Sequence, residues 1–144
     1  MKRYFDFSKI RTSYSYQEFK AMTASLVEKG MTTGPDQSGD KIELTRLNHQ
    51  RLQRIEKRCS ISEDVAEYLR KLEHPQKWYL LVEAWCGDGS ENLPIIANMA
   101  AYSPQVELHI LLRDEHPEIM DQYLTNGSRS IPKLIAVNGL NGEE

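Results

Sequence analysis

Apolar residues recur at helical spacing through the first half of the chain. They do so over residues 15–29, where Gly30 follows as a natural helix stop, and again over residues 40–58. A third helix is expected from Ser62, a good N-cap residue, to the His74-Pro75 pair, because the residue before a proline disfavours helical backbone. The pattern therefore predicts three helices before Pro75.

The pattern changes after Pro75. Residues 78–84 form an apolar run interrupted only by Glu83, as expected of a buried strand. Glu83 is then either a buried proton-accepting carboxylate or a side chain at the sheet edge. The next elements expected are a helix, a strand, a short helix and a strand, over residues 90–101, 106–112, 117–124 and 131–137. This order predicts an α/β sandwich whose first two strands pair in parallel.

Composition narrows the function classes. A net charge of −3 over 144 residues gives no overall attraction for nucleic acid or for an anionic membrane. No apolar run approaches the roughly 20 residues of a membrane span, and the N-terminus lacks the apolar core of a signal peptide. We therefore expect a cytoplasmic protein with neither a nucleic acid nor a membrane as its partner. The basic residues of 46–58 are interpreted as a solvated helix face.

The cysteines and histidines carry the candidate chemistry. Cys59 and Cys86 are too few for a disulfide framework, and no histidine stands at metal-ligand spacing from them, so neither a metal nor a cofactor is expected. Cys86 lies at a strand-to-helix turn, where free N–H groups and the helix dipole favour a thiolate. The turn-forming residues 87–90 place it near the surface, although Asp88 opposes a second negative charge. The alternative is a buried structural thiol.

Several segments resemble a bacterial thioredoxin-like family with a helical N-terminal extension. Trp85-Cys86-Gly87 matches the start of the thioredoxin active site, Pro94 falls where thioredoxins kink the following helix, and residues 127–133 resemble the segment that leads into their cis-proline. The other matching segments are Thr33-Gly34-Pro35, Leu44-Thr45-Arg46-Leu47-Asn48, Glu83-Ala84-Trp85-Cys86-Gly87-Asp88, Leu112-Arg113-Asp114, Asp121 to Gly127, and Arg129 to Leu134.

The resemblance implies a thioredoxin-like three-layer α/β sandwich. Residues 1–75 would form a helical N-terminal extension packed on a core of residues 76–144, and this core would lack the last strand and helix. The Ile131-Pro132 bond would be cis. The exposed strand edge left by the missing strand would favour a dimer. Cys86 and Asp88 would be catalytic, with Asp88 relaying protons, and the substrate would contact Trp85, Gly87, Ile131 and Pro132.

One departure from the family pattern bears on activity. The second cysteine of a dithiol site would stand at position 89, which is Gly89. A mixed disulfide on Cys86 would then be resolved by glutathione, by another protein or by Cys59. Because glycine is a poor helix former, Gly89→Cys is expected to restore dithiol chemistry at no cost in helix propensity.

Two functions therefore stay open. The first is a monothiol redox protein in which Cys86 attacks a disulfide or oxidised thiol of a protein or a small molecule. The second is a catalytically inactive thioredoxin-fold module that binds a peptide or protein beside Pro132. Whether the protein is an enzyme depends on which of these holds, and the reactivity of the Cys86 thiol distinguishes them.

Overall fold

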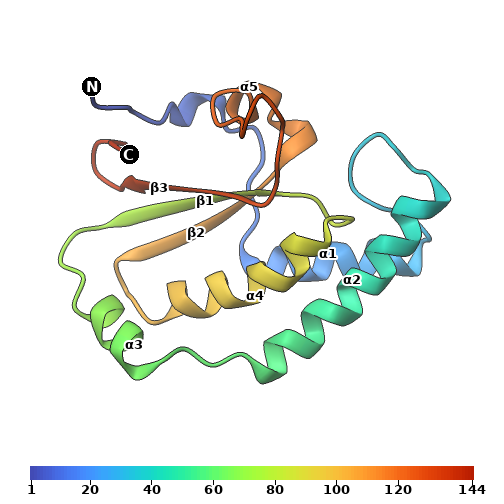
Figure 1. The fold of residues 1–144 in the computed structure, drawn as a ribbon, viewed down its shortest axis with the longest axis horizontal. Coiled ribbons are helices and arrows are strands. Elements are labelled where there is room, and N and C mark those ends of the chain that lie inside the picture. Colours follow the sequence, from blue (N-terminus) through green and yellow to red (C-terminus); the bar gives the residue numbers. More distant parts are fainter.

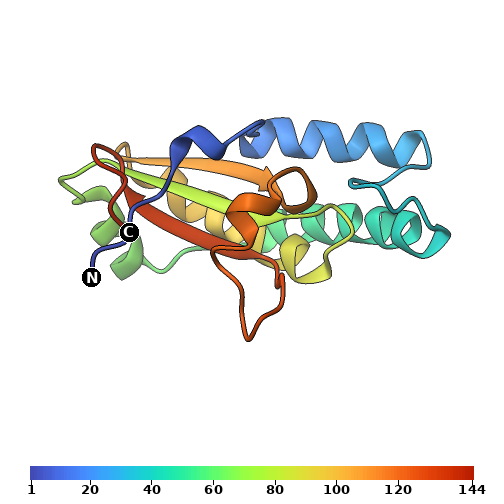
Figure 2. The ribbon, with the colours of Figure 1, turned by 90° about the horizontal axis from the view of Figure 1, so that it is seen from above.

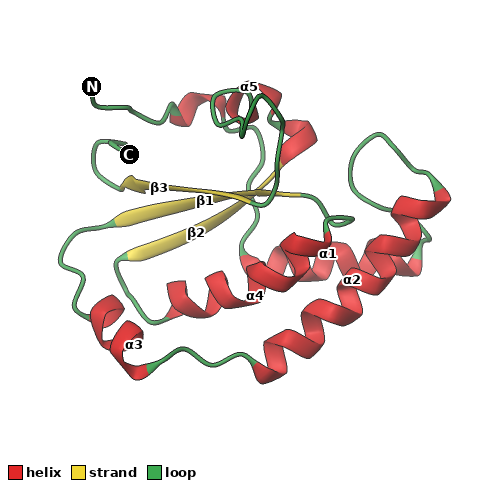
Figure 3. Cartoon of the chain, in the orientation of Figure 1, coloured by secondary structure: helices red, strands yellow, loops and turns green.

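A three-stranded sheet lies at the centre of the fold, with helices on both of its faces (Figures 1 and 3). The computed structural model describes all 144 residues. The strand order is β2-β1-β3, with bounds β1 Gln76–Val82, β2 Val106–Leu112 and β3 Lys133–Asn138. β1 and β2 pair in parallel, as predicted, and β3 runs antiparallel to β1.

Strand alternation divides the core between the two faces of the sheet, because successive side chains of a strand point to opposite sides. On one face the strand residues of the core are Tyr79, Leu81, Leu111, Ile135 and Val137, and they pack with Phe5, Ile119 and Met120. On the other face they are Leu80, Val82, Ile110 and Leu112, and they pack with Phe19, Leu52, Cys86 and Leu93. The sandwich therefore has the three layers expected.

Three helices cover the face that carries Cys86: α1 Tyr16–Glu28, α2 Gly39–Arg58 and α4 Gly87–Ala101. α1 and α2 run side by side and extend past the end of the sheet (Figure 2). α3, Glu63–Arg70, packs Leu69 near the end of α4. Each of α1, α2 and α3 begins after a serine whose hydroxyl accepts a backbone N–H of the first turn.

The opposite face is covered by α5, Pro117–Met120, and by a short 3₁₀ helix, Phe7–Lys9. Both α3 and α5 are shorter than predicted, by about one turn at their C-terminal ends. None of the helices is both long and apolar enough to cross a membrane. Residues from both halves of the chain share the core, and the division at residue 75 stays a prediction.

The N-terminal segment, residues 3–14, is laid across elements from the end of the chain. Tyr14 forms an antiparallel bridge with Ile110 at the outer edge of β2, and the N–H of Phe5 donates to the carbonyl of Gly142 at 2.8 Å. Between these points the buried His116 accepts the N–H of Arg11 at Nε2, 3.0 Å away, while its Nδ1 lies 2.9 Å from the carbonyl of Leu112. His116 therefore fastens the N-terminal segment to the core.

Candidate functional site

Cys86 is the N-cap residue of α4. Its Sγ accepts the N–H of Gly89 at 3.4 Å, and the helix begins at Gly87, three residues before the predicted start at residue 90. The prediction was late because capping preferences are known mainly for oxygen side chains. Pro94 therefore lies well inside the helix rather than at its beginning.

The thiol is less accessible than the sequence suggested. Cys86 is only 8% exposed, although glycines and polar residues follow it. The thiol lies 3.7 Å from the carbonyl oxygen of Ile131, and its other neighbours are core side chains such as Leu52. The turn lies near the surface, since Asp88 is exposed, but the thiol itself is buried because Ile131 and Leu52 of α2 pack against it.

Burial also overrides the helix dipole. Loss of hydration raises the pKa of the Cys86 thiol above its ordinary value. The N–H groups of Gly89 and Asp88 and the charge of Arg113 act to lower this pKa, whereas the Asp88 carboxylate raises it. The expected depression of the pKa is therefore wrong for the protein in this conformation.

The structure brings most of the predicted site residues to this turn. The Ile131-Pro132 peptide bond is cis, and the carbonyl oxygen of Ile131 points to the thiol. The ring of Trp85 has Lys41 Nζ 4.1 Å from its centroid and Arg113 Cζ 5.0 Å from it. Asp88 is exposed, and its carboxylate accepts no hydrogen bond. Its negative charge lies close enough to act on the thiol, but nothing connects the two by hydrogen bonds.

Neighbouring side chains leave little room for a Cβ at Gly87 or at Gly89. A Cβ at Gly87 would lie 3.3 Å from Nη1 of Arg51. A Cβ at Gly89 would lie only 2.4 Å from Cγ2 of Val82, which is 1% exposed. Helix propensity therefore does not decide the cost of Gly89→Cys, because α4 packs so closely against β1 that a side chain at position 89 requires Val82 or α4 to shift.

Cys59 does not reach Cys86. It is the C-cap residue of α2, and its Sγ accepts Nδ2 of Asn98 at 3.4 Å. Asn98 stands 12 residues beyond Cys86 along α4, which at 1.5 Å per residue corresponds to about 18 Å. A disulfide requires Cα atoms within about 7 Å, so Cys59 is excluded as the resolving thiol in this fold.

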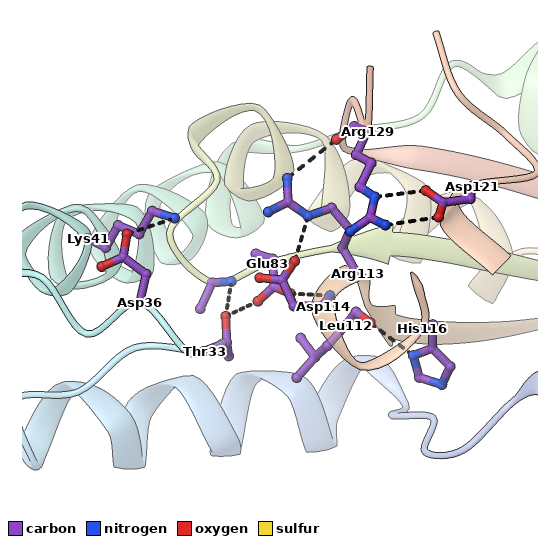
Figure 4. Close-up of polar contacts among 11 residues, drawn as sticks. Thr33, Asp36, Lys41, Glu83, Leu112, Arg113, Asp114, His116, Asp121 and Arg129 are labelled. Carbon is purple, nitrogen blue, oxygen red and sulfur yellow. Dashed lines mark hydrogen bonds and ion pairs between the residues drawn. The ribbon is translucent and has the colours of Figure 1, made fainter. Parts of the chain in front are cut away.

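A buried carboxylate joins three segments just before Cys86 (Figure 4). Glu83 is 1% exposed, its Oε1 accepts the N–H of Asp114 at 2.9 Å, and its Oε2 accepts the hydroxyl of Thr33. That hydroxyl oxygen also accepts the N–H of Ala84 at 3.0 Å. Burial raises the pKa of Glu83, and the hydrogen bonds from Thr33 and Asp114 act to lower it. Of the two interpretations of Glu83, the buried carboxylate is correct.

A second polar contact holds the same turn from α2. Asn48, which is 2% exposed, lies with Nδ2 3.5 Å from the carbonyl of Ala84, and its Oδ1 accepts Nη1 of Arg51 at 3.1 Å. A small cavity of about 10 Å³ lies beside it, with Cys86 and Ser90 in its wall. Such a volume is about that of one water probe. The interface between α2 and the Cys86 turn is therefore polar as well as buried.

Sequence reasoning gave no role to Thr33, Asn48, Arg113 or Asp114. The signal was present, since all four stand in segments that carried the family resemblance. What the sequence did not indicate is that these segments meet around Glu83 and residues 84–87. No group of three or more histidine, cysteine, aspartate or glutamate side chains is arranged to hold a metal ion.

Comparisons with known proteins support a thioredoxin-like fold. A family model described as Thioredoxin matches residues 34–144. A crystal structure of a protein of unknown function from Pseudomonas aeruginosa is similar, with a TM-score of 0.56 and 19% identity over 90% of this chain and 74% of that one. The crystal structure of an HIV epitope scaffold is similar at a TM-score of 0.55, again with 19% identity and the same coverage. A comparison with curated proteins finds no match.

Proposed function

Because this chain belongs to the thioredoxin family, we propose that it is a thiol redox protein of the monothiol type, with Cys86 as its nucleophile. The observation that carries the proposal is the position of the sulfur. It caps the N-terminus of α4 and faces the carbonyl of Ile131, immediately before the cis bond to Pro132. An extended substrate segment lying against residues 131–132 would bring its disulfide to this sulfur.

The proposed reaction is thiol–disulfide exchange. The Cys86 thiolate attacks one sulfur of a substrate disulfide, a bond forms between Cys86 and that sulfur, and the second substrate sulfur leaves as a thiolate. An external thiol then attacks the mixed disulfide and releases Cys86. Because position 89 holds glycine and Cys59 lies about 18 Å away along α4, the resolving thiol comes from glutathione or another protein.

The surrounding residues have different proposed roles. Trp85, Gly87, Ile131 and Pro132 contact the substrate, and Asp88 exchanges protons with solvent at the mouth of the site. Because burial raises the pKa of Cys86, substrate binding that moves the covering residues or brings a positive charge would favour the thiolate. The proposed setting is a reducing bacterial cytoplasm, where glutathione or protein thiols can resolve the mixed disulfide.

Two single-cysteine variants test the proposal. Cys59→Ser leaves Cys86 as the only thiol, and Cys86→Ser leaves Cys59. We expect oxidised glutathione to add one glutathione to Cys59→Ser, detected by mass spectrometry, and reduced glutathione to remove it. The thiol-redox proposal fails if Cys86 in the folded Cys59→Ser protein stays unmodified while the same protein in urea is modified.

The second candidate function is a binding module without thiol chemistry. The observation in its favour is the 8% exposure of Cys86 together with its raised pKa. In this case a peptide or protein would bind beside Pro132, and Cys86→Ser would bind it as well as the parent.

The outer edge of β3, where Leu134 and Ala136 are exposed, is the proposed contact for a dimer. A strict monomer in sedimentation at millimolar concentration contradicts this dimer.

A further inference from the structure

A groove runs between α2 and α4. Its walls are Arg51, Arg54, Ile55 and Arg58 of α2 together with Glu91 and Ile95 of α4, and its volume is about 430 Å³. Small-molecule sites typically enclose about 300–1,000 Å³. The groove begins where Arg51 lies beside Gly87, next to the Cys86 turn, and it ends near Cys59.

The arginines of this groove have no acidic partner. Arg54 and Arg58 make no hydrogen bond or ion pair, and Arg51 donates only to the neutral amide of Asn48. On α2, Arg46 pairs with Glu43 and Glu56 pairs with Lys20, whereas Asp40 and Lys57 make no ion pair. Three arginines therefore face a single glutamate, Glu91, in a protein whose net charge is −3.

The stability of α2 alone does not explain why Arg51, Arg54 and Arg58 lie together along one groove. Arg58 lies in the last turn of α2, where a positive charge interacts favourably with the helix dipole. Arg51 and Arg54 lie further from the end, and like charges three or four residues apart on a helix repel each other. Repulsion among these guanidinium groups is unfavourable in the free protein, and an anion bound over them would relieve it.

We propose that this groove binds a small molecule that carries at least two negative charges, as phosphate or carboxylate groups. Guanidinium groups match both of these anions with paired hydrogen bonds. Ile55 and Ile95 provide apolar contact for the carbon skeleton of such a ligand, and Glu91 accepts hydrogen bonds from its hydroxyl or amino groups. The site does not depend on thiol chemistry at Cys86, so it stands whether or not the proposed redox function holds.

Isothermal titration calorimetry of the whole chain tests this site. Inorganic pyrophosphate is the probe for a phosphate ligand, and S-methylglutathione, which cannot exchange thiols, is the probe for a carboxylate ligand. The test variant is Arg54→Gln/Arg58→Gln, because both side chains are exposed and unpaired and their loss should not disturb folding. Lys57→Gln is the matched control, since Lys57 is an exposed cation of the same turn that does not line the groove.

We expect one probe to bind the parent and Lys57→Gln equally, and to bind the double variant about ten-fold or more weakly, since hydrogen bonds between charged groups are lost. Bound probe should also slow the alkylation of Cys59. The proposal is overturned if neither probe binds at up to about 10 mM, or if Lys57→Gln weakens binding as much as the double variant does. It is also overturned if only a single-stranded RNA binds and pyrophosphate does not displace it.

Discussion

The two faces of the sheet are packed by different kinds of residue. On the side of α5 eight buried residues from Phe5 to Val137 form one apolar cluster, and His116 at the start of α5 is the buried polar residue beside it. On the side of α1, α2 and α4 an apolar cluster of equal size also contains Cys86, and it adjoins buried polar residues, namely Thr23, Thr45, Asn48 and Ser90. The candidate chemistry lies on the second face only.

The two faces therefore have different roles: the α5 face contributes to stability, and the other face also sets the environment of Cys86. The α5 face places no nucleophile near a substrate, and few of its buried groups are polar, so its contacts contribute mainly to stability. On the polar face each buried group must find a partner, and those partners fix the backbone around Cys86. Substitutions on the first face should therefore change stability alone, and substitutions on the second should change the reactivity of Cys86 as well.

The largest expected effect is that of Leu111→Ala on the apolar face. Leu111 is fully buried, so truncating it should lower the free energy of unfolding by about 2–5 kcal/mol. Urea denaturation measures this loss. The alkylation rate of Cys86 in the folded variant should equal that of the parent, and a rate that rises several-fold would break the separation between the two faces.

Gly89→Cys is the next largest change and tests the close contact on the polar face. The new Cβ would overlap Val82, so overpacking should cost about 1–3 kcal/mol. Val82→Ala removes the overlapping methyl group, and Val82→Ala/Gly89→Cys should therefore lose less stability than the two single variants together. Strict additivity in this double-mutant cycle would show that α4 moves away from β1 instead.

Asn48→Ala should combine a loss of stability with a change in reactivity. Its amide is buried against the carbonyl of Ala84, and leaving that carbonyl without a partner should cost about 1–3 kcal/mol. The Cys86 turn should loosen, and alkylation of Cys86 in a Cys59→Ser background should become faster. Asn98→Ala is the matched control, because Asn98 contacts Cys59 and lies far from Cys86 along α4. Equal rates in the two variants would remove the proposed role of Asn48.

Glu83→Gln should change stability least at low pH, and its effect is visible as a pH dependence. Because burial raises the pKa of Glu83 in the folded protein, its contribution to stability is complete below the ordinary glutamate pKa of about 4.3 and is lost as pH rises through the folded value. The parent should therefore lose stability relative to Glu83→Gln as pH increases from 4 towards 7, by at most about 1.4 kcal/mol per pH unit. Urea denaturation at each pH measures the difference, and a gap that stays constant with pH contradicts the buried carboxylate.

The sequence predicted the elements better than the environment of Cys86. Helical spacing and serine caps indicated α1, α2 and α3, and the apolar run before Cys86 indicated β1, because these signals are local. The burial of Cys86 was missed because it depends on Ile131, 45 residues later, and on α2. The contact between Gly89 and Val82 was missed for a similar reason, since the separation of a helix from a strand is a property of packing and has no periodicity in the sequence.

The N-terminal segment has a consequence for the order in which the molecule assembles. Arg11 and His116 are 105 residues apart in the sequence, and Phe5 meets Gly142 across an even longer interval. Contacts of such high sequence separation form slowly, because a long loop must close before they stabilise anything. Residues 3–14 should therefore attach last when the chain folds. Under a pulling force applied at Met1, residues 3–14 should detach first, while the sheet and the helices packed on it stay folded.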